Sequence, residues 1–221
     1  MKFYFISLYL FFIAGRASFA QERIILDEQI RLIGKERSMY TVPLIYRISS
    51  EFGSVSINRL RRALRAVIMK HQVLRTALNF DENGSIVQRI AQIESSCNEK
   101  DFYKFTIIYM DDETIDQNST IYRALYDRSM FDIEMGHVFH VYIIYHAKRD
   151  SEVEDILTFK DMVIFSIHHS VFDGASIPIL VRELSLSYNL DGVLKIDDNA
   201  LQYIDYATHE HELDMSTSRD F

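Results

Sequence analysis

Two adjacent histidines, His168 and His169, close an apolar segment and are followed by Asp173 and Gly174. Successive side chains of a strand point to opposite faces, so we expect one imidazole to be buried and the other to be free for a substrate. A histidine titrates near neutral pH and can orient or accept a proton at an attacking amine. The alternative is that both rings only make local hydrogen bonds at the end of a strand.

The last two residues of this motif predict how it joins the next element. Asp173 is predicted to return beneath the turn and to hold the loop through an ion pair. Gly174 permits a positive φ or a close backbone approach. Apolar residues then recur at helical spacing over residues 176–188, so we expect a helix to begin near Ser176.

The elements that must position this motif follow from the apolar periodicity. Ser56 is predicted to cap a helix whose apolar face continues to His71. Residues 74–80 and 85–90 are predicted to form a hairpin around a turn at 81–84. The remaining predicted elements are strands at 105–110, 138–145 and 162–167 and a helix at 115–128. Because 138–145 is apolar on both faces, it is expected to be a central strand of a layered α/β fold.

Composition limits the classes of function that the chain can have. The chain has 221 residues and a net charge of -8, which does not suit a nucleic-acid partner, because phosphates require a basic face. Cys97 is the single cysteine, so neither an internal disulfide nor a Cys-rich zinc site can form. His209 and His211 could bind a metal, but an exposed polar helix face explains them better, and we predict no metal site.

The N-terminal segment permits two interpretations. The apolar run over residues 3–15 is too short to span a bilayer and fits the hydrophobic region of a signal peptide. Ser18 and Ala20 have the small side chains that a signal peptidase prefers. The other interpretation is a buried strand or an appended segment.

The motif at residues 168–174 matches the HHxxxDG signature of condensation domains, the amide-forming acyltransferase modules of nonribosomal peptide synthetases. Epimerisation domains and some wax-ester and acylglycerol acyltransferases share this signature. Five further blocks resemble condensation domains in order and spacing, at residues 18–23, 40–44, 70–76, 131–136 and 202–207. One departure is His140, which stands where the family usually has arginine and is expected to alter a surface charge. Residues 18–221 therefore resemble the N-terminal half of a condensation domain, and residues 1–17 are expected to be a separate apolar segment.

The resemblance implies a fold, a reaction and a role for each motif residue. The fold would be a chloramphenicol-acetyltransferase-like half domain, an α/β structure with a mixed β-sheet flanked by helices. The reaction would join a donor thioester to an acceptor amine, both carried on phosphopantetheine arms of carrier proteins, with no cofactor bound directly. His169 would orient or deprotonate the amine, and Gly174 would provide backbone room near the tetrahedral intermediate. His168 would be structural, and Asp173 would hold the loop by pairing with Arg75.

The resemblance also predicts partners and location. Carrier proteins and a C-terminal half of the domain are the expected partners, and without that half the chain is expected to be catalytically silent. A cytoplasmic location is favoured over secretion, and no membrane partner is expected. Two alternatives remain. One is a non-catalytic half-domain remnant or fragment, and the other is a secreted glycosylated binding protein, to which the acceptor patterns at Asn83 and Asn118 point.

Overall fold

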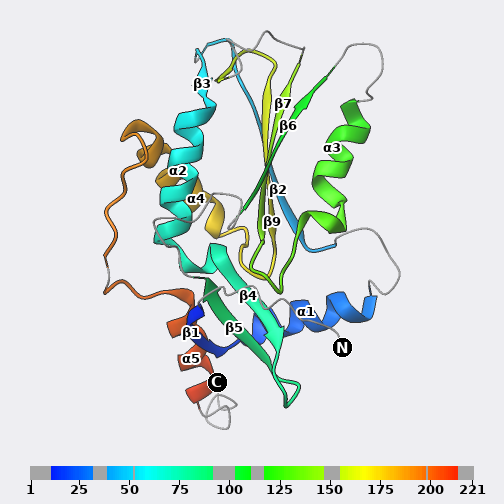
Figure 1. The fold of residues 1–221 in the computed structure, drawn as a ribbon, viewed down its shortest axis with the longest axis vertical. Helices are drawn as coiled ribbons and strands as arrows, with labels where there is room; N and C mark the ends of the chain where they lie inside the picture. Colours follow the sequence, from blue (N-terminus) through cyan, green and yellow to red (C-terminus); the bar gives the residue numbers. More distant parts are fainter. Residues whose placement is uncertain are drawn as a thin grey trace, which may run out of the picture.

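The computed structural model describes residues 11–31, 39–51, 53–91, 103–110, 117–146, 155–197 and 199–213. Within these ranges a four-stranded sheet lies above a three-stranded sheet, and helices cover both faces of the larger one (Figure 1). This arrangement confirms the predicted α/β layers with a mixed sheet. The histidine motif leaves the large sheet at the end that faces the small sheet.

The large sheet has the strand order β2 (Thr41–Arg47), β9 (Met162–His168), β7 (Phe139–Tyr145) and β6 (Lys104–Tyr109). Strands β6 and β7 are parallel, and the other neighbours are antiparallel. All residues of β7 and β9 are buried. The predicted central strand at 138–145 is therefore confirmed, and β9 is a second one.

Two helices cover one face of this sheet. Helix α2 (Ile57–Lys70) packs against α4 (Ser176–Asn189), and together they enclose the main apolar core with β7 and β9. The side chain of Ser56 accepts a hydrogen bond from the Arg59 N–H at 3.2 Å, which confirms the predicted N-cap. The helix predicted at 176–188 is confirmed in α4.

Helix α3 (Gln117–Tyr126) covers the opposite face of the large sheet (Figure 1). Its apolar residues Ile121 and Leu125 pack on Tyr142 and Ile164, which point away from α2 and α4. The helix predicted at 115–128 is thus confirmed within the described part of the chain. The sheet is apolar on both sides because helices bury both of its faces.

The small sheet has the order β1 (Phe11–Arg16), β5 (Ile86–Ala91) and β4 (Thr76–Phe80), all antiparallel. The predicted hairpin is confirmed, with Gly84 at φ 79° in its turn. Its first strand is shorter than predicted, because the 3₁₀ helix η1 (Gln72–Arg75) occupies the start of residues 74–80. The Leu74 N–H donates to the His71 carbonyl at 3.1 Å, so this turn continues α2 rather than pairing in the sheet.

The remaining elements include the two helices nearest the ends of the described chain. They are α1 (Phe19–Arg31), α5 (Tyr203–Glu212), the short strands β3 (Val55–Ser56) and β8 (Ile156–Leu157), and η3 (Arg128–Met130). Helix α5 packs on β1, and the Phe19 N–H donates to Glu210 Oε2 at 2.8 Å. The hydroxyls of Ser18 and Tyr203 lie 2.8 Å apart. The start of α1 is therefore anchored by α5.

The apolar N-terminal segment enters the described structure as β1. Residues 1–10 lie outside the described residues, so the signal-peptide interpretation of that part is not tested. Ala20, one of the two small residues that suit a signal peptidase, lies inside α1. None of the helices in the described ranges has the length and apolar character that a bilayer crossing requires.

His140, predicted on the surface, is instead buried in β7, with 6% of its surface exposed. The prediction was wrong because β7 is a central strand whose two faces are both covered. The ring stacks on Tyr142 at a centroid distance of 3.9 Å, and Nε2 lies 2.8 Å from the Thr106 hydroxyl. Burial lowers the pKa of His140 to about 4.

Candidate functional site

His168 ends β9 and is fully buried, at 0% exposure. Its backbone N–H donates to the Val138 carbonyl at 2.9 Å, which continues the pairing of the sheet into the motif. The edge of the Phe131 ring packs against the imidazole at a centroid distance of 5.3 Å. The first motif histidine is therefore held by the sheet on its backbone side and by apolar contacts on its ring.

Both ring nitrogens of His168 are bonded to buried groups. The Ser170 N–H donates to Nδ1 at 3.2 Å, and the Ser170 hydroxyl lies 2.8 Å from the same nitrogen. Nε2 lies 3.1 Å from Glu28 Oε2, and Glu28 is 6% exposed. Because Nδ1 accepts from a backbone N–H, the proton of the neutral ring is assigned to Nε2, where it is donated to the carboxylate.

His169 has the opposite surroundings. Its backbone N–H donates to the Tyr40 carbonyl at 2.7 Å, while its side chain is exposed and makes no hydrogen bond to another described residue. The chain then turns, with the Val171 N–H donating to the His168 carbonyl at 3.1 Å. The expectation that one imidazole is buried and the other is free is confirmed, with His168 inside and His169 outside.

The predicted ion pair between Asp173 and Arg75 was wrong. Asp173 Oδ1 instead accepts hydrogen bonds from the Ser176 N–H at 2.9 Å and from its hydroxyl at 2.6 Å. These bonds, the hydroxyl first, hold the pKa of Asp173 below its ordinary value. Ser176 is the first residue of α4, so a nearer local partner takes the place of the distant guanidinium.

Arg75 is satisfied by backbone carbonyls. Its Nη1 donates to the Ala91 carbonyl at the end of β5, and its Nε lies 3.4 Å from the Ile68 carbonyl in α2. Burial lowers the pKa of its guanidinium. Within the part of the chain that the structure describes, no salt bridge joins Arg75 to a carboxylate. Arg75 therefore ties α2 to the small sheet rather than holding the motif loop.

Gly174 leaves open space beside the motif. A methyl group in place of its hydrogen would meet no described atom within 4 Å. Gly174 does not have a positive φ, so the first of the two alternatives expected for this glycine does not apply. The other expectation, room for the close approach of another group, stays a prediction that this open space permits.

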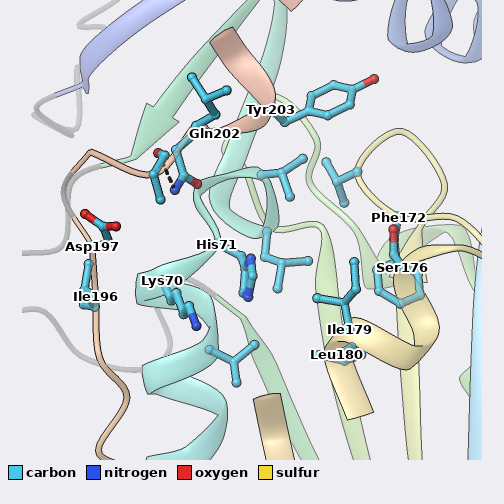
Figure 2. Close-up of a pocket in the computed structure, with 16 residues that line it drawn as sticks. Lys70, His71, Phe172, Ser176, Ile179, Leu180, Ile196, Asp197, Gln202 and Tyr203 are labelled. Atoms are coloured by element: carbon cyan, nitrogen blue, oxygen red, sulfur yellow. Dashed lines mark hydrogen bonds between the residues drawn. The ribbon is translucent and has the colours of Figure 1, made fainter. Parts of the chain in front are cut away.

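A pocket of about 320 Å³ lies next to the motif loop, between α2, α4 and the segment that leads into α5 (Figure 2). Val171, Phe172 and Ser176 of the motif region form part of its wall, and most of the wall is apolar. His71 also lines it, and its Nε2 is buried with no hydrogen-bond partner among the described residues. Burial lowers the pKa of His71. The pocket is thus a mostly apolar space, and the buried Nε2 of His71 in its wall has no hydrogen-bond partner among the described residues.

The sequence interpretation missed Glu28. Gln21, Ile25 and Glu28 are the buried residues of α1, and they follow the spacing of one helix face. That spacing could have indicated a carboxylate on the inner side of α1, although nothing in the sequence gives its partner. The predicted site residues His168, His169, Asp173 and Gly174 lie together at the end of β9 and on the loop that follows it, and Arg75 lies outside this group. Across the described ranges, no cluster of three or more His, Cys, Asp or Glu side chains is arranged to hold a metal ion.

Comparisons with known proteins agree on one family. The model of the Condensation domain family matches residues 16–220. Fusarin C synthetase from Gibberella fujikuroi is 30% identical over 175 residues, which cover 79% of this chain and 4% of the synthetase. The chain thus spans only about 4% of the length of the first curated relatives that it matches.

Solved structures show the same fold. The condensation domain from the monacolin K polyketide synthase MokA aligns with a TM-score of 0.62 at 19% identity, over 91% of this chain and 39% of that one. A variant of the starter condensation domain of the rhizomide synthetase RzmA, solved in complex with C8-CoA, aligns with a TM-score of 0.63 at 16% identity, over 90% and 41%. The predicted chloramphenicol-acetyltransferase-like fold is confirmed.

Proposed function

This chain belongs to the condensation-domain family, and we propose that it supplies the histidine-bearing half of a site that joins a carrier-bound thioester to an amine. The observation that carries the proposal is that the His169 side chain is exposed, whereas His168 and Asp173 of the same motif are held in place by the fold. His168 is fully buried, and Asp173 is bonded to α4, so the loop has a defined shape. The open space at Gly174 leaves room for a substrate next to that imidazole.

The proposed step is an acyl transfer in which His169 handles one proton. The amine nitrogen attacks the thioester carbon, and a C–N bond forms. The tetrahedral intermediate then collapses with cleavage of the C–S bond. One proton moves from the amine to the departing thiolate, and His169 orients the amine or carries this proton. The products are an amide and a free thiol, so no oxidant or metal is needed to balance the step.

We assign the apolar pocket beside the loop to the apolar part of an acyl donor. The RzmA starter domain variant was solved with C8-CoA, an aliphatic thioester, and this chain has the same fold. Phe172 and Leu180 lie in the wall of the pocket, and its volume of about 320 Å³ falls at the lower end of the ordinary range for small-molecule sites. Burial of an aliphatic chain in such a space is favourable in proportion to the apolar area removed from water.

We also propose that carrier proteins and a second half of the domain complete the site. The chain spans 39% of the solved MokA chain, and the apolar residues Ile179, Leu186 and Leu190 of α4 and its end are each at least 45% exposed. A site open on one side does not hold an amine against its thioester, and the advantage of proximity is lost. The 221-residue chain alone is therefore expected to form no amide.

The test replaces His169 with alanine in this chain joined to a second condensation half. With two loaded carrier proteins, the rate of amide formation should fall about 10²- to 10⁴-fold, the usual range for loss of a group that transfers a proton. His209→Ala, at an exposed histidine on α5, is the matched control and should have no effect. Equal rates for His169→Ala and the unmodified protein would refute the assignment.

A further inference from the structure

We propose that Glu28 of helix α1 is a positioning residue, which orients the catalytic loop through the buried ring of His168, and that its neighbour Asp27 supports the same loop through Tyr40. This inference rests on the proposed role of His169. It adds Glu28, which lies on α1 rather than in the histidine motif, and to which neither the motif resemblance nor the sequence spacing assigned a role.

The first route runs from Glu28 to the residue that follows His169. Glu28 Oε2 accepts from His168 Nε2 at 3.1 Å, and on the other side of the ring Nδ1 accepts from the Ser170 N–H at 3.2 Å. His168 and Ser170 flank His169 in the chain. The imidazole of His168 therefore bridges the two residues on either side of the catalytic position, and Glu28 fixes the rotation of that imidazole.

The second route runs from Asp27 to the backbone of His169. The Tyr40 hydroxyl donates to Asp27 Oδ2, and the Tyr40 carbonyl accepts from the His169 N–H at 2.7 Å. The contact with Tyr40 lowers the pKa of Asp27, and it raises the pKa of Tyr40. Arg31, one turn further along α1, donates to Asp27 Oδ1 at 2.6 Å and holds the carboxylate in place.

The geometry of α1 explains how two consecutive carboxylates can reach the same loop. Neighbouring residues of a helix point about 100° apart, so Glu28 faces the interior while Asp27 lies at the edge. Glu28 is buried, and Asp27 is half-buried. Helix α1 is itself fixed at its start, because Ser18 contacts Tyr203 and the Phe19 N–H donates to Glu210.

A buried carboxylate hydrogen-bonded to a buried imidazole is a costly way to fill space. A well-packed apolar pair of the same volume would often be equally stable or more stable. What the carboxylate adds is direction: it selects the Nε2–H form of the ring, which leaves Nδ1 as the acceptor for the Ser170 N–H. A positioning role requires this selection of the Nε2–H form, whereas a purely structural role does not.

The first measurement uses the unmodified 221-residue chain labelled with ¹⁵N-histidine. Nuclear magnetic resonance at a pH of about 8, where a histidine of ordinary pKa is neutral, should show His168 in the Nε2–H form with a slowly exchanging proton. His169 should show an exposed, averaging ring. An Nδ1–H form of His168 would overturn the proposal. Because this measurement needs no turnover, its outcome is independent of whether the chain proves to be a condensation enzyme.

Two substitutions of Glu28 separate the effect of its charge from the effect of its acceptor oxygen. Glu28→Gln keeps an acceptor oxygen and should preserve the Nε2–H form, whereas Glu28→Leu removes the acceptor and should lose it. Glu22→Gln is the control, since Glu22 lies on the same helix and its carboxylate contacts the exposed Arg16 at 3.4 Å. Persistence of the Nε2–H form in a folded Glu28→Leu chain would contradict the proposal.

The activity arm uses this chain joined to a second condensation half. Glu28→Leu should lower kcat on the order of 10²-fold, the loss that a displacement of about 1 Å can cause, with KM little changed. Glu28→Gln should restore most of the rate. In a His169→Ala background, Glu28→Leu should have almost no further effect, because the group that it positions is gone. If Glu28→Leu lowered kcat by the same factor in the His169→Ala background as in the unmodified protein, Glu28 would act on stability alone.

Discussion

The inner and the outer side of the motif loop satisfy their polar groups in different ways. On the inner side, both nitrogens of His168 are bonded to buried partners, and the ring is closed off by Phe131. On the outer side, the imidazole of His169 is exposed, and Gly174 borders open space. The two histidines are consecutive in the chain, so the strand geometry alone divides one sequence motif into a closed and an open half.

The difference between the two sides indicates which residues stabilise the fold and which are available to react. Loss of one partner from a buried polar network leaves the others without hydrogen bonds, which is costly. An exposed side chain contributes little to folding and is available for a substrate. The inner side should therefore control the free energy of unfolding and the outer side the reaction. Four sets of substitutions test this comparison.

The largest effect on stability is expected for His168→Ala. It removes the partner of the buried Glu28 and of Ser170, and a buried carboxylate left without its partner typically costs about 3–5 kcal/mol. His169→Ala is the matched control and should change the free energy of unfolding by less than about 0.5 kcal/mol. Urea denaturation at neutral pH measures both. Similar losses for the two variants would remove the distinction between the sides.

A second buried histidine extends the comparison to pH. The His140 ring is hydrogen-bonded to the Thr106 hydroxyl rather than to a carboxylate, and burial lowers its pKa to about 4, against 6.5 in the unfolded chain. The unfolded state therefore binds more protons between these values, and stability is lost as the pH falls from about 6.5 to about 4. The loss from this group is at most about 3 kcal/mol. His140→Gln should flatten that part of the curve of thermal midpoint against pH.

The control for the His140 test is His209→Gln, which removes an exposed histidine and should leave the curve unchanged. If the slopes between about pH 4 and 6.5 were the same for the unmodified chain and His140→Gln, another group would have to account for the acid sensitivity. The measurement should be restricted to conditions in which unfolding is reversible.

Substitutions of Asp173 and Arg75 test whether the two side chains interact. Asp173→Ala removes the acceptor for the Ser176 N–H and hydroxyl at the start of α4, and loss of a side-chain acceptor at a helix start typically costs about 1 kcal/mol. Arg75→Met removes the donors to the Ile68 and Ala91 carbonyls. Because the two side chains share no partner among the described residues, the losses should add within about 0.5 kcal/mol in the double variant. A clear departure from additivity would restore the ion pair that the structure does not form.

The smallest effect on stability is expected for Gly174→Ala. A methyl group there meets open space, so the free energy of unfolding should change by less than about 0.5 kcal/mol. Gly136→Ala is the contrasting control, because Gly136 has φ 77° and its methyl would lie 3.3 Å from the Arg75 carbonyl oxygen. If Gly174→Ala lowers amide formation in the completed domain while the fold is unchanged, the open space belongs to the site. Unchanged activity would place Gly174 outside it.

Several features were decided by the sequence alone. The apolar periodicity predicted α2, α4, the hairpin and the central strand β7, because these segments bury one helix face or both strand faces. The HHxxxDG motif and its five companion blocks predicted the family, which the match over residues 16–220 confirms. The alternation of strand side chains predicted that His168 and His169 differ. Such local patterns can be interpreted from the sequence alone, because they depend only on neighbours in the chain.

Contacts between distant segments were decided only by the tertiary structure. Glu28 and His168 are 140 residues apart, and nothing in either local pattern names the other as a partner. Asp173 found a nearer hydrogen-bond donor in Ser176, and Arg75 found two carbonyls, so the ion pair inferred from resemblance did not form. His140 became a buried base because both faces of β7 are covered. A side chain's partner and its pKa depend on what packs against it, and that is fixed only when the elements assemble.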